Sequence, residues 1–312
     1  MGRPRVRQLE RHRRRGTAVM KWSARALVIA VPMLWLLLFF LLPFLVVGKI
    51  SVSEAAIARP PYLPIYEIED GALILRIAYA NFTFLFEDPL YLAAYLNSLK
   101  IAAYSTLFSL IVAYPMAYYI ARCEARKRNI LLMLVILPFW TSFLLRVYAW
   151  IGILKTNGIL NNMLLGVGII DEPLVMMQTD FAVYVGVVYT YLPFMVLPLY
   201  TNLVKLDQSL LEASADLGAN PIVTFLKVTL PLSIPGIVAG SMLVFIPVVG
   251  EFVIPALLGG PDQLMIGKVL WTEFFSNRDW PVASAVAIVM LMVVVMPIMW
   301  LRNHTERMEA AA

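Results

Sequence analysis

Windows of about 20 predominantly apolar residues constrain this chain most, because each is long enough to cross the hydrocarbon of a bilayer as a helix. The chain is 61% hydrophobic and only 14% charged, a balance that a water-soluble domain of 312 residues does not keep in solution. The sequence contains six such windows: 26–47, 99–120, 130–154, 181–203, 234–258 and 282–301. It therefore predicts an all-α membrane protein with six transmembrane helices between residues 26 and 301.

Charges between the windows predict the side of the membrane on which each loop lies, since Lys and Arg are retained in the cytoplasm. With the N-terminus inside, the inner segments hold 17 of the 25 Lys and Arg but seven of the 20 acidic residues. The outer segments hold six basic and twelve acidic residues. Both counts predict cytoplasmic termini: a basic tail over residues 1–25, and a C-terminal tail over 302–312.

The basic tail is interpreted as an orientation signal that also contacts anionic membrane lipid, rather than as a nucleic-acid site. The window that follows it is expected to be retained as a span, because no A-x-A-like cleavage site is present. The outer loop over 48–98 is too long for a simple turn and is expected to form a partly structured periplasmic cap. Two shorter apolar stretches, 158–170 and 264–275, are expected to be interfacial or re-entrant helices.

The inner loop over 204–233 carries a first short helix. Ser209 followed three residues later by Glu212 is typical of a capping box, so the helix is predicted to begin at Leu210. Gly218 can adopt the left-handed conformation that ends a helix.

A second short helix is predicted directly afterwards. Asn220 is a suitable N-cap and Pro221 a suitable first residue, and this helix is expected to end near Val228, before Pro231. Two short helices joined by a rigid elbow suit the transmission of a push from a partner protein, because they move as one unit.

This loop resembles the EAA loop of ABC importer permeases, with Ser214 and Val228 in place of the usual Ala and Ile. The resemblance implies that the loop docks in a groove of a separate cytoplasmic ATPase, with Glu212 and Gly218 at the contact. The expected ATPase-coupling residues are Glu212, Ala213, Ser214, Asp216, Gly218 and Pro231. The alternative is purely structural: Glu212 completes a capping box and Gly218 ends a helix.

The resemblance extends over most of the chain, from about residue 34 to about residue 300. Segments 137–150, 245–255, 258–262 and 277–281 are similar to putrescine-type polyamine permeases of the type I (MetI-like) importer fold. This implies import of putrescine or spermidine across the bacterial inner membrane. The implied partners are a second permease in a heterodimer, a pair of ATPase subunits that hold ATP and Mg, and a soluble periplasmic or extracellular polyamine-binding protein.

Glu251 is the sole acidic residue inside a predicted span and is therefore the first candidate for the path of a cationic cargo. Pro247, Gly250 and Pro255 flank it and can open the helix, which would expose backbone carbonyls. The alternative is that Glu251 pairs with Arg146 or with a helix end for structural reasons.

The last outer loop offers further acidic and aromatic groups that suit a cation. Trp271, Glu273, Asp279 and Trp280 are predicted to form a mouth beneath the binding protein. The alternative for the tryptophans is ordinary anchoring at the membrane interface.

Catalytic and metal chemistry is not expected of this chain. It has one cysteine, Cys123, and its two histidines, His12 and His304, lie in the tails. The sequence also lacks G-x-x-x-x-G-K-[ST], so ATP hydrolysis is assigned to another chain and no cofactor is expected here. An importer for another small cationic or organic solute, a secondary transporter and a membrane enzyme are the alternative functions.

Overall fold

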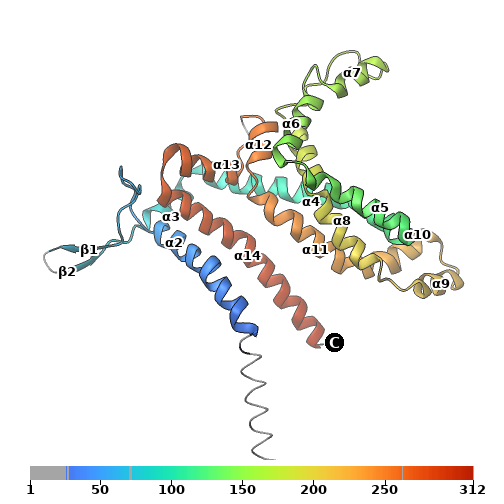
Figure 1. Cartoon of the computed structure of the whole chain (residues 1–312), viewed down its shortest axis with the longest axis horizontal. Coiled ribbons are helices and arrows are strands. Elements are labelled where there is room, and N and C mark those ends of the chain that lie inside the picture. The colour runs from blue at the N-terminus through green and yellow to red at the C-terminus, as the bar shows by residue number, and fades with distance from the viewer. Residues whose placement is uncertain (1–25, 27, 70–71, 262, 312) are drawn as a thin grey trace, which may run out of the picture. The chain divides into compact units, whose positions relative to one another are not determined.

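The computed structural model describes residues 26, 28–69, 72–261 and 263–311 (Figure 1). The predicted basic tail over 1–25 lies outside them. The chain forms two compact units, one of residues 1–81 with 280–288 and the other of residues 82–279 with 289–312.

The first unit joins an apolar helix to a small hairpin. A π-helical turn, η1 (Leu37–Leu41), leads into α2 (Leu42–Ser51), and strands β1 (Tyr66–Glu69) and β2 (Ala72–Leu75) then pair antiparallel. The side chain of Asn81 donates to the carbonyl oxygens of Ser51 and Ser53 at 2.9 and 2.8 Å. These bonds connect Asn81, which follows the hairpin, to the end of α2.

The second unit contains most of the helices. Its elements, some of which begin or end in the first unit, are α3 (Ala80–Glu87), α4 (Pro89–Arg122), α5 (Ala125–Ile136), η2 (Leu137–Trp140), α6 (Phe143–Leu154), α7 (Ile159–Gly166), α8 (Asp180–Leu203), α9 (Gln208–Asp216), α10 (Pro221–Thr224), η3 (Phe225–Thr229), α11 (Leu230–Val249), α12 (Val253–Leu258), α13 (Ile266–Trp271), η4 (Thr272–Asn277) and α14 (Trp280–Ala311). Both short apolar stretches, at 158–170 and 264–275, contain helices.

Five helices among the described residues are long and apolar enough to cross a membrane. They are Val28–Ser51, Pro89–Arg122, Phe143–Gly166, Asp180–Leu203 and Pro221–Val249. The sixth predicted window falls on α14, in which Trp280–Met296 is an apolar helix among the residues that the structure describes fully.

The third predicted window, 130–154, is wrong as a single helix. The chain breaks after the 3-10 turn η2, where Thr141 is extended and its hydroxyl donates to the carbonyl oxygen of Pro138 at 2.7 Å. Proline lacks the backbone N–H that an α-helix interior needs, and α5 accordingly ends at Ile136, just before Pro138, with the 3-10 turn following it. The candidate span of this region is Phe143–Gly166 instead.

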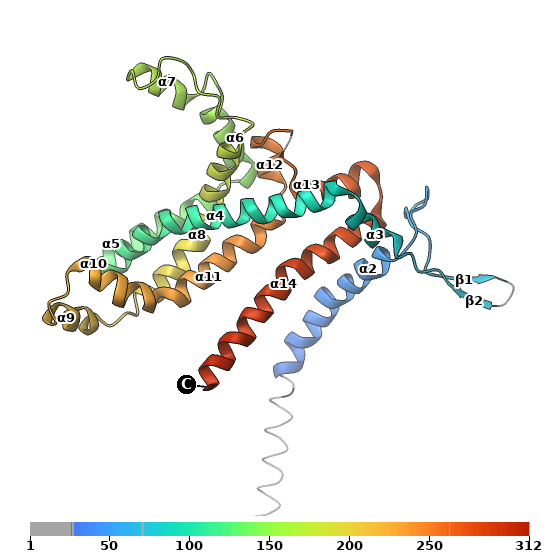
Figure 2. The ribbon, with the colours of Figure 1, turned by 180° about the vertical axis from the view of Figure 1, so that it is seen from behind.

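The core of the second unit is formed by α4, α8 and α11, which lie side by side in both views (Figure 1, Figure 2). Small side chains recur every three or four residues on the buried face of α4, at Ala94, Ser98, Ala102, Ser105, Ser109, Ala113 and Ala117. On α11, a Cβ at Gly240 would lie 2.7 Å from the sulfur of Met195. Small residues allow helix backbones to approach closely, which is how helices associate in lipid.

Candidate functional site

The inner loop begins with an N-cap that the sequence analysis did not identify. The carboxylate of Asp207 accepts the backbone N–H of Ser209 at 2.9 Å, so α9 begins at Gln208 rather than at Leu210. The predicted capping box on Ser209 is therefore wrong. Hydrogen bonds from the backbone and then the side chain of Ser209 lower the pKa of the Asp207 carboxyl. The cap is thus fully formed above the ordinary aspartate pKa and is lost only as the pH falls through the lowered value.

The predicted end of this helix at Gly218 is confirmed. Gly218 is left-handed, with φ of +79°. Its N–H donates to Ala215 at 2.9 Å, and the N–H of Ala219 donates to Ser214 at 3.1 Å. These two bonds form a Schellman motif, which satisfies the last carbonyls of α9 and sets the direction in which the chain leaves it.

The start of the second helix is also confirmed, but its end is not where the sequence predicted. The side chain of Asn220 accepts the N–H of Val223 at 2.8 Å, and Pro221 is the first helical residue. The helix then continues through η3 into α11 as one span, Pro221–Val249. Residues 207–224 are called the coupling elbow below.

Pro231 does not end this helix, and a π turn, η3, directly precedes it. There the N–H of Leu230 donates to the carbonyl oxygen of Phe225, five residues back. The π turn has already shifted the hydrogen bonds out of α register where the donor of Pro231 is missing. Prolines inside α4, α8 and α11 are likewise tolerated. Pro231 consequently lies within the span rather than beside α9.

Most of the predicted coupling residues lie on the outer surface of the elbow. Glu212, Ala213, Asp216 and Gly218 are exposed, whereas Ser214 is buried. Three exposed large apolar side chains of the same elbow were missed, Leu210 at 45%, Leu217 at 88% and Ile222 at 69% exposure. Large apolar residues in a polar interhelical loop were the signal that could have identified them as part of a contact surface.

Glu251 lies in the break between α11 and α12, so the predicted opening of the helix at Gly250 is confirmed. Its Oε1 accepts the backbone N–H groups of Phe252 and Val253 at 3.1 and 2.9 Å. Its Oε2 accepts the hydroxyl of Tyr191 on α8 at 2.6 Å. The side chain is only 8% exposed, and the carboxylate caps the first turn of α12.

The break is held by close backbone packing rather than by an ion pair with Arg146. A Cβ on Gly267 would overlap the carbonyl oxygens of Gly250 and Glu251, so glycine is required for this approach. The Nε and Nη1 atoms of Arg146 find no hydrogen-bond partner among the described residues. Its guanidinium lies instead over the ring of Phe139, 5.3 Å from the centroid.

An aromatic stack lies next to Glu251. The ring of Phe252 stacks on that of Trp271, with centroids 4.4 Å apart and planes 12° from parallel. The ring of Phe275 lies 4.1 Å beyond Trp271. Trp271 is 43% exposed, so the stack, which begins at the residue after Glu251, includes an accessible ring face.

The other residues of the predicted mouth belong to different units: Glu273 and Asp279 to the second, and Trp280 to the first. Glu273 accepts the hydroxyl of Tyr91 at 3.0 Å and the side-chain amide of Asn277 at 2.9 Å. The backbone N–H of Asp279 donates to the carbonyl oxygen of Glu273 at 2.9 Å. Trp280 belongs to the first unit, where its ring is 6.3 Å from that of Tyr62.

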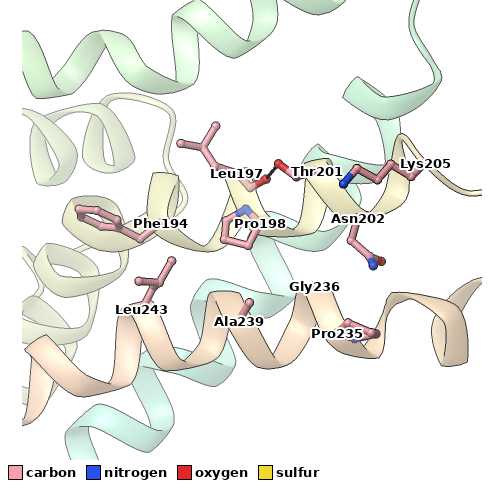
Figure 3. Close-up of a pocket in the computed structure, with 10 residues that line it drawn as sticks. All are labelled: Phe194, Leu197, Pro198, Thr201, Asn202, Lys205, Pro235, Gly236, Ala239 and Leu243. Carbon is pink, nitrogen blue, oxygen red and sulfur yellow. Dashed lines mark hydrogen bonds between the residues drawn. The ribbon is translucent and has the colours of Figure 1, made fainter. Parts of the chain in front are cut away.

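A groove of about 470 Å³ runs between α8 and α11 (Figure 3). One end is apolar, at Phe194, whose ring lies 6.1 Å from that of Tyr191. The other end is polar and contains Thr201, Asn202 and Lys205. The groove therefore begins beside the partner of Glu251 and ends at the start of the coupling elbow.

Comparison with known proteins places these features in a family. A model of the binding-protein-dependent transport system inner membrane component matches residues 92–307. The spermidine/putrescine transport system permease protein PotB of Haemophilus influenzae is 40% identical over 264 residues, which cover 84% of this chain and 87% of that protein.

Solved structures share the fold. A chain of a bacterial ABC transporter involved in the import of the acidic polysaccharide alginate superposes with a TM-score of 0.70 at 17% identity, covering 95% of this chain and 99% of its own. The alginate transporter in complex with an alginate pentasaccharide-bound periplasmic protein gives a TM-score of 0.70 at 16% identity, with 94% and 97% covered. The predicted importer-permease fold is thus confirmed. The family match and the identity to a permease together show that this chain belongs to the binding-protein-dependent transport system inner membrane components, a multi-pass family of the bacterial inner membrane.

Proposed function

We propose that this chain is the transmembrane subunit of an ATP-driven importer that carries putrescine, spermidine or both into the cytoplasm. The observation that carries the proposal is the buried carboxylate of Glu251, which lies at a helix break beside a stack of aromatic rings. Carboxylates and aromatic faces are the groups that bind alkylammonium cations. The 40% identity to a spermidine/putrescine permease supports the same cargo.

The coupling elbow receives the motion of a separate ATPase pair, which holds the ATP and Mg. The exposed carboxylates of Glu212 and Asp216 and the exposed Leu217 form the contact. The motion reaches the helix break at Glu251 through one continuous helix, because Pro221–Val249 begins in the elbow and ends next to Glu251. When this helix tilts, the break at Glu251 moves with it, because the break follows directly at the end of the helix.

Cargo enters at Trp271 and Glu273, is held near Glu251 and leaves along the groove between α8 and α11. A second permease subunit supplies a further wall of this path. Lys205 at the inner end of the groove repels a cation, so the cargo does not remain bound there. A periplasmic binding protein delivers the cargo, as the complex of the alginate transporter with its periplasmic protein supports.

The proposed sidedness places both termini and the coupling elbow in the cytoplasm, with six spans. Leu217→Cys and Ile57→Cys, each in a Cys123→Ser background, replace two well-exposed side chains, one in the elbow and one in the outer segment. In intact cells, an impermeant maleimide is expected to label Ile57→Cys but not Leu217→Cys. Labelling of Leu217→Cys before the membrane is permeabilised would contradict the proposed sidedness.

Reconstitution tests the function itself. The chain is purified with its second permease and ATPase pair and placed in liposomes with the binding protein. Uptake of labelled putrescine or spermidine is expected to require ATP, and Glu212→Arg is expected to reduce both uptake and co-purification of the ATPase. Uptake driven by an ion gradient without ATP would support a secondary transporter, and uptake of another cation alone would replace the cargo.

A further inference from the structure

The coupling elbow contains a side-chain hydrogen bond that joins its two helices. The hydroxyl oxygens of Ser214 on α9 and Thr224 on α10 lie 2.8 Å apart. Ser214 is 9% exposed and is the one described residue of α9 that is buried. Because α10 continues into α11, this bond connects α9 directly to the helix that ends next to Glu251.

The two faces of α9 have different surroundings. Gln208, Leu211 and Ser214 recur at intervals of three residues and so lie along one face. Gln208 and Leu211 line a small cavity with Thr229 of η3, while Ser214 reaches Thr224. Glu212 and Asp216 are exposed on other parts of the helix. A force applied to Glu212 and Asp216 is therefore resisted at Leu211 and Ser214.

Among the contacts of this face of α9, the Ser214–Thr224 hydrogen bond depends on the relative orientation of the two side chains. Leu211 makes apolar contacts, which tolerate sliding, whereas a hydrogen bond weakens steeply when its angle or length changes. The carbonyl oxygen of Ser214 also accepts the N–H of Ala219 in the Schellman motif. One residue thus holds both the turn after α9 and the helix beyond that turn.

We propose that the Ser214–Thr224 hydrogen bond fixes the angle between α9 and the α10–α11 span, and so determines how much of the ATPase's motion reaches the membrane. Ser214 and Thr224 are positioning residues, since they act through the helix and touch neither ATP nor cargo. The inference rests on the proposed function of the elbow. It adds that the efficiency of coupling, measured as cargo imported per ATP hydrolysed, depends on two hydroxyl groups that face away from the ATPase.

The test uses the complete transporter in proteoliposomes with Ser214→Ala, Thr224→Val and the double variant, which remove hydroxyls with little change of shape. Cargo imported per ATP is expected to fall about fivefold, the factor that corresponds to one net hydrogen bond. The double variant is expected to fall no further than either single variant, because both remove the same bond. Co-purification of the ATPase is expected to stay unchanged, and the melting temperature is expected to fall by only about a few degrees, the loss that corresponds to one net hydrogen bond.

Ser142→Ala is the matched control, because Ser142 is exposed at the start of α6 and its side chain makes no cap hydrogen bond. It is expected to keep the wild-type ratio. An unchanged ratio in all three elbow variants would overturn the inference. If Glu212→Arg still uncouples transport, that result leaves the proposed function standing; if Glu212→Arg is also normal, the proposed role of the elbow fails.

A covalent replacement of the bond gives a second test. Ser214→Cys with Thr224→Cys, in a Cys123→Ser background, is expected to form a disulfide under oxidation. The oxidised protein is expected to import cargo at the wild-type ratio and the reduced protein at the lower ratio. Inhibition by the disulfide would show that the angle must change during the cycle. That result, an equal ratio in both redox states, or failure of the disulfide to form would each overturn the inference.

Discussion

Gly218→Val is expected to reduce ATP-dependent uptake by about tenfold or more, and Gly218→Pro to abolish it. Gly218 has φ of +79°, a conformation that costs an ordinary L-residue about 1–2 kcal/mol and a β-branched one more. Proline is excluded because its ring holds φ near −65°. Either substitution displaces the turn that directs the chain from α9 into the span.

Gly218→Asn is the matched control, since asparagine adopts the left-handed conformation far more readily than valine. No neighbouring atom lies within 4 Å of a Cβ placed at Gly218, so the size of the side chain is not the obstacle. Uptake and ATP hydrolysis are measured together in the reconstituted transporter. Normal transport by Gly218→Pro would show that the geometry of this turn does not matter for coupling.

Glu251→Gln is expected to lower uptake at least about tenfold while the protein remains folded, a factor that corresponds to roughly 1.4 kcal/mol. The amide oxygen of glutamine can still accept the N–H groups of Phe252 and Val253, so the cap of α12 is largely kept. The negative charge that would attract the cargo is lost. The expected defect is therefore in transport rather than in folding.

Glu251→Ala separates the structural role of this carboxylate from its proposed role in transport. It leaves the N–H groups at the start of α12 without their acceptor, and each buried unsatisfied group costs about 1–3 kcal/mol. Glu251→Ala is thus expected to lower both the melting temperature in detergent and uptake, whereas Glu251→Gln lowers uptake alone. Full uptake by Glu251→Gln would mean that the carboxylate serves only as a helix cap.

Tyr191 was not predictable from the sequence, although it makes the shortest of the hydrogen bonds described for Glu251. Sixty residues separate the two, and a tyrosine in an apolar helix has many ordinary roles. Only the packing of α8 against α11 brings its hydroxyl to the carboxylate. The stack of Phe252 on Trp271 and the bond between Ser214 and Thr224 depend in the same way on how the chain turns back on itself.

The sequence by itself determined the features that depend on a few neighbouring residues or on bulk polarity. These are the membrane location, the left-handed end of α9 at Gly218, the start of the next helix at Asn220 and the helix opening at Gly250. A cap or a glycine turn acts on backbone groups within three or four positions, so its effect can be predicted locally.

Only the tertiary structure decided which helices continue and which side chains meet. Pro138 precedes a break, whereas Pro231 lies in an uninterrupted span, although both are prolines in apolar surroundings. The two sites differ in hydrogen-bond register: a π turn precedes Pro231, and a 3-10 turn contains Pro138. Such register shifts, like the contacts of Glu251 and Ser214, are selected by helix packing across the whole unit, which local sequence signals do not specify.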